Sequence, residues 1–133
     1  MTMNSADAAA GTDARASEYN NLRKDVKNGI KDITADSDAA TITFNLSTSN
    51  LHSVTLGGNR TLALSNETVG QIFTVRLVQD GTGSRTVTWW SNIKWPDAVA
   101  PTLTTTASRI DVFTFLVTSS GNYDCLGITQ NLG

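Results

Sequence analysis

The composition of this chain changes near residue 38, and the change limits what each part can fold into. Residues 1–38 carry seven acidic and five basic side chains, whereas the 95 residues that follow carry five of each. The second part consists of short runs rich in Thr, Val, Leu and Phe, separated by Gly, Asn, Asp and Ser, which is the pattern of strands and turns. We therefore expect a charged appendage over residues 1–38 and a β-domain over residues 39–133.

The β-part contains seven runs that predict strands. They are residues 41–46, 51–56, 61–64, 70–79, 85–90, 109–117 and 123–128. Gly57–Asn59 joins two of these runs, Asp80–Gly83 joins the longest pair, and Ser120–Asn122 precedes the last. Such segments are rich in turn-forming residues. Short strands at this spacing predict a mainly β fold, an antiparallel β-sandwich or jelly roll.

Apolar residues in the first part recur at spacings of 3, 4, 4 and 3, which places them on one stripe of an α-helix. The stripe consists of Tyr19, Leu22, Val26, Ile30 and Ile33. A helix this short is marginally stable alone, so its stripe must pack on something. We expect one N-terminal α-helix that attaches the β-domain.

The segment between this helix and the first strand, residues 33–41, is predicted to be a linker. Its Asp36 and Asp38 alternate as calcium ligands do, but the other oxygen ligands and the glycine of a calcium loop are missing. We therefore expect a solvated linker and no metal site.

The run at residues 109–117 is apolar on both faces. Ile110, Val112 and Leu116 alternate with Phe113 and Phe115. An antiparallel strand with one wet face would alternate apolar and polar residues, so this strand is expected to be covered on both sides. The strand is covered either by the helix or a loop of the same chain, or by a second subunit. If a second subunit covers it, these five residues form a subunit interface.

The segment around Trp89, Trp90 and Trp95 is the best candidate for recognition. Alternation along a strand at residues 85–90 points Trp89 and Trp90 to opposite faces, so one of them meets something outside the sheet. Trp90 is then either an interface anchor, which we favour, or a platform on which a sugar stacks. Trp95 belongs to the loop that follows and is fixed by the next residue, a proline.

Several partner classes are excluded by bulk properties. The net charge is −2, the pI is about 5.1, and the β-part has no basic stripe, so nucleic acid is not an expected partner. No apolar run approaches the roughly 20 residues of a membrane span. The first residues lack the features of a signal peptide, so we expect a soluble protein made in a cytoplasm.

A catalytic constellation is also missing from the sequence. His52 is the single histidine and Cys125 the single cysteine, which excludes a His-rich zinc site and an internal disulfide. Both are expected to be ordinary strand residues. A glycosidase built from the few carboxylates of the β-part is the least expected function. We expect no enzyme, no metal and no cofactor.

The stretch from Leu56 to Leu126 contains an L-GGNRTL start, a GQ-F-TVRL-QDGTG hairpin, a TVTW-NIKWP loop, a PTLTTT run and an R-DVFTFL strand. With these motifs the chain resembles a β-module of tailed-bacteriophage virion proteins, of the tail-fibre, tail-tip and head-decoration type. The segment ASEYNNLRKDV resembles an attachment-proximal helix of short phage structural proteins. Where such modules often have proline after the first tryptophan, this chain has Trp90. The resemblance implies trimeric knobs and carries over no active site.

The resemblance implies a virion component made in a bacterial host. Because the chain is short and starts at its own methionine, it is expected to be complete and to lack a fibre shaft. The first interpretation is therefore a capsid decoration or cement protein that forms homotrimeric knobs bound to the major capsid protein. The alternative is a receptor-binding tail-fibre or tail-tip module that uses Trp90 and Trp95 to recognise a host surface glycan.

Overall fold

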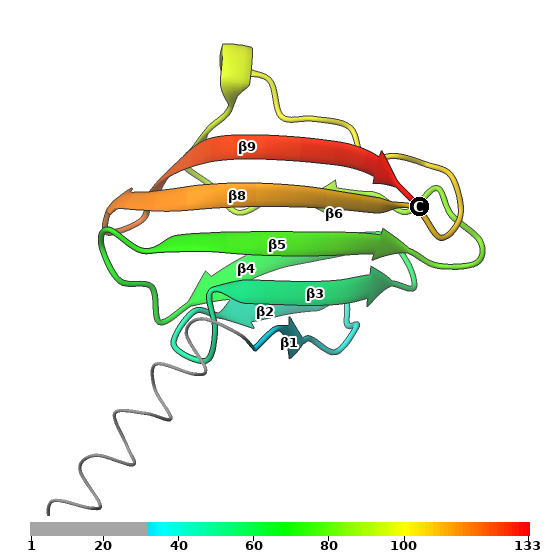
Figure 1. The fold of residues 1–133 in the computed structure, drawn as a ribbon, viewed down its shortest axis with the longest axis horizontal. Coiled ribbons are helices and arrows are strands. Elements are labelled where there is room, and N and C mark those ends of the chain that lie inside the picture. Colours follow the sequence, from blue (N-terminus) through cyan, green and yellow to red (C-terminus); the bar gives the residue numbers. More distant parts are fainter. Residues whose placement is uncertain (1–31) are drawn as a thin grey trace, which may run out of the picture. The chain divides into compact units, whose positions relative to one another are not determined.

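The computed structural model describes residues 32–133, which form nine β-strands and one short 3₁₀-helix (Figure 1). The elements are β1 (Thr34–Ala35), β2 (Thr41–Asn45), β3 (Leu51–Leu56), β4 (Arg60–Ser65), β5 (Ile72–Gln79), β6 (Val87–Thr88), β7 (Ile93–Lys94), η1 (Pro96–Ala98), β8 (Ile110–Ser119) and β9 (Asn122–Leu132). The predicted mainly β fold is confirmed.

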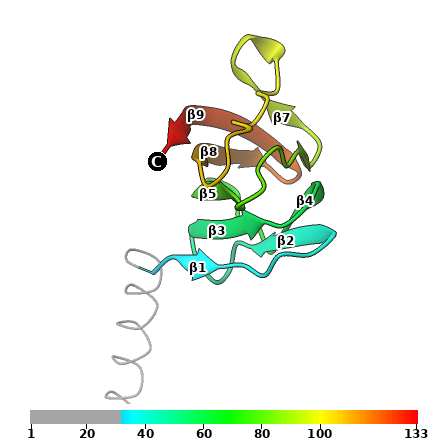
Figure 2. The ribbon, with the colours of Figure 1, turned by 90° about the vertical axis from the view of Figure 1, so that its right-hand side faces the viewer.

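The strands form two sheets that share one core (Figure 2). The larger sheet has the order β1-β3-β5-β8-β9-β7, and the smaller has the order β2-β4-β6. From β1 to β7, each strand lies in the opposite sheet from the strand before it. The chain therefore winds around the core, passing from one sheet to the other at each connection.

Five of the seven strand pairs are parallel, so the predicted antiparallel pairing is wrong for most of the fold. The turns explain the difference. Gly57–Asn59 leads from β3 to β4 and Asp80–Gly83 leads from β5 toward β6, and each time the next strand joins the other sheet. The chain returns to the first sheet only after that strand and then pairs in parallel, as β5 does with β3 after β4. The intervening strand of the opposite sheet serves as the crossover connection.

The strand β8 pairs antiparallel with both of its neighbours, β5 and β9. The turn at Ser120–Asn122 closes the β8–β9 hairpin, where Ser119 lies opposite Asn122. Gly121 has a φ of 76°, a conformation that glycine adopts without steric cost. The turn predicted before the last strand is thus a true hairpin turn.

The core lies between the two sheets and is formed by the inward side chains of alternating strand positions. Burial of one such side chain stabilises the fold by about 1.5–3 kcal/mol. The fully buried apolar members are Phe44, Phe73, Phe113, Phe115, Ile42, Leu56, Leu62, Leu77, Val75 and Val117. Both sheets contribute to this set, which holds them together.

Two residues of the predicted linker, Thr34 and Ala35, form β1 of the larger sheet, whereas most residues from 33 to 40 are exposed, as expected of a solvated segment. Strand β1 pairs in parallel with β3, and the backbone N–H of Asp36 donates to the carbonyl oxygen of Ser53 at 2.8 Å. The carboxylate of Asp38 accepts hydrogen bonds from two nitrogens of Arg60, each at 2.7 Å. These bonds from Arg60 lower the pKa of Asp38. The two aspartates fasten the chain to the sheets and do not share a metal-like arrangement.

The predicted attachment helix lies outside the described residues, because Tyr19, Leu22, Val26 and Ile30 all precede residue 32. Ile33 is described, lies outside any helix and is 49% exposed, so its place on a helical stripe is wrong. The attachment role of residues 1–38 stays a prediction.

Candidate functional site

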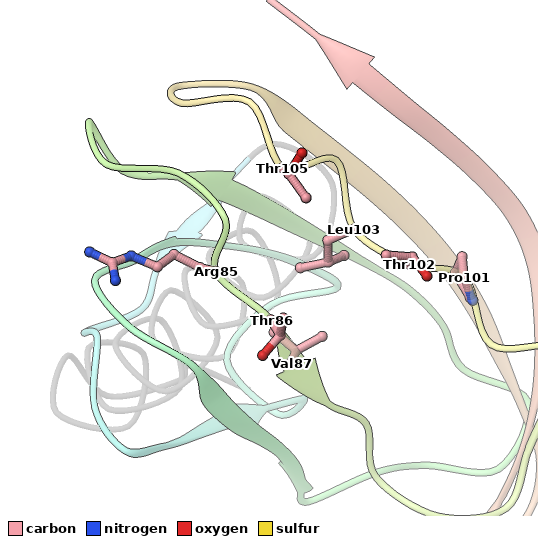
Figure 3. A pocket seen from close by; sticks show the side chains of 7 residues that line it. All are labelled: Arg85, Thr86, Val87, Pro101, Thr102, Leu103 and Thr105. Carbon is pink, nitrogen blue, oxygen red and sulfur yellow. The ribbon is translucent and has the colours of Figure 1, made fainter.

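A pocket of about 210 Å³ opens beside β6, one of the two edge strands of the smaller sheet (Figure 3). Residues 85–87 form one wall and residues 101–105 form the other. The lining residues are Arg85, Thr86, Val87, Pro101, Thr102, Leu103 and Thr105. Figure 3 shows Leu103 between the two segments, whereas Arg85 extends away from the other lining side chains. The lining therefore combines an apolar centre with threonine hydroxyl groups.

The two walls are joined by the buried side chain of Gln79, at the end of β5. Its Nε2 donates to the carbonyl oxygen of Arg85 at 2.9 Å and to that of Thr104 at 2.8 Å. Its Oε1 accepts from the backbone N–H of Arg85 at 2.9 Å. The side chain of Gln79 thus forms three hydrogen bonds with Arg85 and Thr104, neither of which lies in a β-strand.

The second wall is also held by Asp111, a carboxylate on β8 that is 3% exposed. It accepts from the backbone N–H of Thr104 at 2.7 Å, from Nε2 of Gln130 at 3.1 Å and from the backbone N–H of Asn131 at 3.0 Å. Burial opposes ionisation, but these hydrogen bonds outweigh it and lower the pKa of Asp111. The buried carboxylate is a structural acceptor, fully occupied by donors.

The connection before β6 approaches the second wall closely at Gly83. A Cβ atom at Gly83 would lie 2.5 Å from the carbonyl oxygen of Thr105, and its φ of 74° suits glycine. The next backbone N–H, that of Ser84, donates to the same oxygen at 2.7 Å. The predicted turn glycine is therefore needed for the contact between the two walls.

The charge of Arg85 is compensated outside the pocket by Asp80. Nη2 of Arg85 lies 2.8 Å from Oδ2 of Asp80, and Nε lies 3.1 Å from Oδ1. Asp80 also accepts from the backbone N–H groups of Thr82 and Gly83. The bonds from Arg85 are the main cause that lowers the pKa of Asp80 to about 2. The pair fixes the turn that precedes β6.

The three tryptophans pack together on the core. The ring of Trp89 lies 4.7 Å from that of Phe113 and 5.0 Å from that of Trp95, and the ring of Trp90 lies 4.9 Å from that of Phe115. The predicted opposite orientation of Trp89 and Trp90 fails because β6 ends one residue earlier, so strand alternation does not extend to them. Trp90 and Trp95 are partly buried and pack against this subunit's own core.

The loop after the tryptophans extends beyond the sheets around η1 (Figure 1). Asp97 and Ala98 have φ angles of 55° and 58°, a backbone conformation that costs energy for residues with a Cβ. Val99 is 66% exposed. The packing of Trp95 on Trp89 holds the base of this protruding loop.

The predicted subunit interface is divided between the two faces of β8. Phe113 and Phe115 are completely buried in the core, so in this fold they cannot form an outer surface. Ile110, Val112 and Leu116 alternate with them and are half-buried on the opposite face. As predicted, β8 carries apolar residues on both faces, but the face with Phe113 and Phe115 belongs to the core.

Tyr123 forms a hydrogen bond that the sequence did not suggest: its hydroxyl donates to Oε1 of Glu67 at 2.7 Å. Burial and the neighbouring carboxylate raise the pKa of Tyr123. Oε2 of Glu67 and Nε1 of Trp90, whose ring lies 6.0 Å from that of Tyr123, are buried without a hydrogen-bond partner. The hydrogen bond between Tyr123 and Glu67 fastens the segment after β4 to β9.

The other candidate chemical groups lie apart. Cys125 is half-buried, and burial raises the pKa of its thiol. Within residues 32–133, no three His, Cys, Asp or Glu side chains lie together as a metal site would require. In the same part of the chain, no helix is long and apolar enough to cross a membrane.

Residues 29–124 match the family model described as "Putative phage tail fibre C-terminal domain". The chain belongs to this tail fibre family. The match extends from before β1 to the beginning of β9 and so includes both walls of the pocket and the tryptophan cluster. The search of curated proteins and the search of solved structures each found no match. As a member of the tail fibre family, the chain is a β-module of phage virion proteins, as its sequence motifs suggested.

The sequence singled out the tryptophans of this tail fibre domain but missed the pocket. The pocket depends on Gln79 and Asp111, whose hydrogen-bond partners are mostly distant in the sequence, up to 25 residues away for Gln79 and 20 for Asp111. One signal was present: both are polar residues on strand faces whose other inward residues are apolar, and a buried polar group needs partners.

Proposed function

We propose that this chain is a host-contacting β-module of a phage tail fibre or tail tip. The observation that carries the proposal is the match of residues 29–124 to a tail fibre C-terminal domain. A domain at the end of a fibre is suited to reach the host surface. The expected partner is a host surface glycan.

Two features of the described residues support contact with an outside partner. The loop around η1 protrudes on a base held by Trp95, and it exposes Val99. The pocket beside β6 combines apolar and hydroxyl groups between fixed walls. Such a rigid framework with surface loops is a common arrangement for binding sites.

The family match favours the tail over the head. A capsid decoration or cement protein bound to the major capsid protein was the first interpretation of the sequence, and no observation on the described residues favours it specifically. The predicted absence of enzymatic activity agrees with the structural character of the family and stays a prediction.

We also propose that the module is a homotrimer whose subunits meet through the outer face of the larger sheet. This face carries Ile110, Val112 and Leu116 on β8, and opposite Leu116 lies Ile72 of β5, which is 53% exposed. The same face also carries Thr74, Arg76 and Thr114, so these apolar side chains form a patch within a mixed surface. Burial of these side chains between subunits removes apolar surface from water.

The function is tested by adsorption. The purified full chain should bind cells of the phage's host and slow adsorption of the phage, and gold-labelled antibodies against it should mark tail fibres in electron micrographs. The heat-unfolded chain serves as the control. Labelling of heads, together with binding to purified capsids and not to cells, would overturn the tail proposal in favour of decoration.

A further inference from the structure

We propose that the pocket beside β6 binds one uncharged sugar unit of a glycan. The proposal rests on the proposed host-contacting function and assigns it to a site away from the tryptophans. Four properties of the pocket support it: the chemistry of its lining, its free backbone groups, its charge and its rigidity.

The lining matches a sugar ring in chemical character. The lining includes the apolar Val87 and the buried core residue Leu103, and three threonines, Thr86, Thr102 and Thr105, whose hydroxyl groups can donate and accept hydrogen bonds. A pyranose presents the same combination, with C–H groups on its faces and hydroxyl groups around its edge. The volume of about 210 Å³ lies below the roughly 300–1,000 Å³ of drug-sized sites, so the pocket suits a single unit.

The free edge of β6 adds backbone groups to this lining. Val87 pairs with Arg60 of β4, and the backbone N–H of Arg60 donates to the carbonyl oxygen of Thr86 at 3.0 Å. Because neighbouring residues of a strand direct their backbone groups to opposite sides, the N–H and C=O of Val87 face away from β4. β6 is the last strand of its sheet, so no further strand of that sheet pairs with these groups.

The charges around the pocket favour an uncharged ligand. Arg85 is the charged residue of the lining, and its guanidinium extends away from the other lining side chains (Figure 3). It forms an ion pair with Asp80 at 2.8 Å. The buried carboxylate of Asp111, which bonds to Thr104 of the second wall, is occupied by backbone and amide donors. None of the other residues that line the pocket is charged.

The walls are held in place before any ligand arrives. Gln79 bonds to both walls, Asp111 holds Thr104, and Gly83 allows the two segments to approach. A fixed site loses little conformational entropy on binding, which raises the affinity that a few hydrogen bonds can give. This explains why two buried polar side chains support a surface segment that lies outside the strands.

The test is a titration of the isotopically labelled full chain by NMR. The probes are glucose, galactose, mannose, rhamnose and N-acetylglucosamine at millimolar concentrations, with glucuronic acid as a charged comparison. At least one neutral sugar should shift the backbone amides of residues 85–87 and 102–105 in a saturable manner, and glucuronic acid should bind more weakly. The proposal is overturned if no neutral sugar shifts these amides or if glucuronic acid binds there more tightly.

Matched threonine variants locate the contact. The double substitution of Thr86→Val and Thr102→Val removes two hydroxyl groups at nearly constant volume and should weaken binding about tenfold. Thr88→Val is the control, because Thr88 is exposed on β6, two residues after Thr86, but does not line the pocket. Equal affinity of the double variant and the control would overturn the assignment.

The adsorption assay separates this proposal from the function on which it rests. If the wild-type chain and the double variant slow phage adsorption equally, the host-contacting function stands and the pocket assignment is wrong. If the wild-type chain does not slow adsorption, the host-contacting function is wrong, and the NMR titration still decides on its own whether the pocket binds sugar.

Discussion

Nδ1 of His52 lies 2.9 Å from Oδ2 of Asp36, and this contact joins the segment after β1 to β3. His52 is completely buried, and its Nε2 donates to the carbonyl oxygen of Ser49 at 3.0 Å. A neutral imidazole carries one N–H, which the bond to Ser49 uses. The contact with Asp36 therefore needs a further proton, either on the ring or on the carboxyl group.

This pair predicts a pH-dependent contribution to stability. Burial raises the pKa of Asp36 above its ordinary value of 3.8, so folding favours the protonated carboxyl. Its contribution to the free energy of unfolding is complete below pH 3.8 and is lost as the pH rises through the raised pKa. The side chain introduced by Asp36→Asn does not titrate. The free energy of unfolding of the wild type, relative to that of the variant, should therefore fall as the pH rises. Urea unfolding at a series of pH values measures it, and a pH-independent difference would contradict the prediction.

The second prediction concerns the amide that joins the pocket walls. Gln79→Leu leaves the carbonyl oxygens of Arg85 and Thr104 and the N–H of Arg85 without their partner. Unsatisfied buried polar groups cost about 1–3 kcal/mol, so the free energy of unfolding should fall by at least this amount. Hydrogen exchange should also speed up at residues 85 and 104. Unchanged stability and exchange would show that the walls hold without Gln79.

These two contacts show what the sequence could and could not predict. Alternation of apolar residues located β3, β5 and β8 well, because a half-buried strand repeats every two residues whatever it pairs with. It did not reveal which sheet the next strand joins. Gly57–Asn59 and Asp80–Gly83 were recognised as turns, but a turn that folds back and a turn that crosses to the opposite sheet use the same residue types.

The candidate site was predictable only in part, for a related reason. Trp90 and Trp95 stand out as large aromatic residues, but their direction depends on where β6 ends and on Phe113 and Phe115, which come later in the chain. Asp36 looked like part of a linker because its partner, His52, follows 16 residues later. Sequence patterns of short range cannot show such contacts.

A third prediction follows from the half-buried pair of Asp80 and Arg85. The hydrogen bonds from Arg85 lower the pKa of Asp80 to about 2 from 3.8. Its stabilising contribution is therefore present above pH 3.8 and is lost as the pH falls toward 2. Asp80→Asn should remove this part of the acid sensitivity, which thermal unfolding between these pH values can detect. An identical acid dependence in wild type and variant would contradict it.

The fourth prediction tests the assignment of Trp90 to the core of its own subunit. Its ring packs on Phe115 at 4.9 Å and on Phe73 at 6.0 Å. Because Trp90 is partly buried, Trp90→Ala should lower the free energy of unfolding by up to about 3–5 kcal/mol, the cost of removing a fully buried aromatic side chain. Denaturant unfolding of the variant measures this at low protein concentration. Full stability with weakened assembly would instead restore the interface-anchor interpretation.

The last prediction tests the trimer through the outer face of the larger sheet. Leu116 is half-buried there, whereas its neighbours on β8, Phe115 and Val117, are completely buried in the core. In a lone subunit, Leu116→Lys places a flexible charged side chain at a surface that water can reach, so folding should be little affected. In a trimer it places a charge inside an apolar interface, which is unfavourable. Light scattering should give the mass of three 14.2 kDa chains for wild type and a lower mass for the variant. Val99→Lys is the control, because Val99 is 66% exposed on the protruding loop and should leave the mass unchanged. A wild-type chain that is monomeric at micromolar concentration would show that this face does not join subunits.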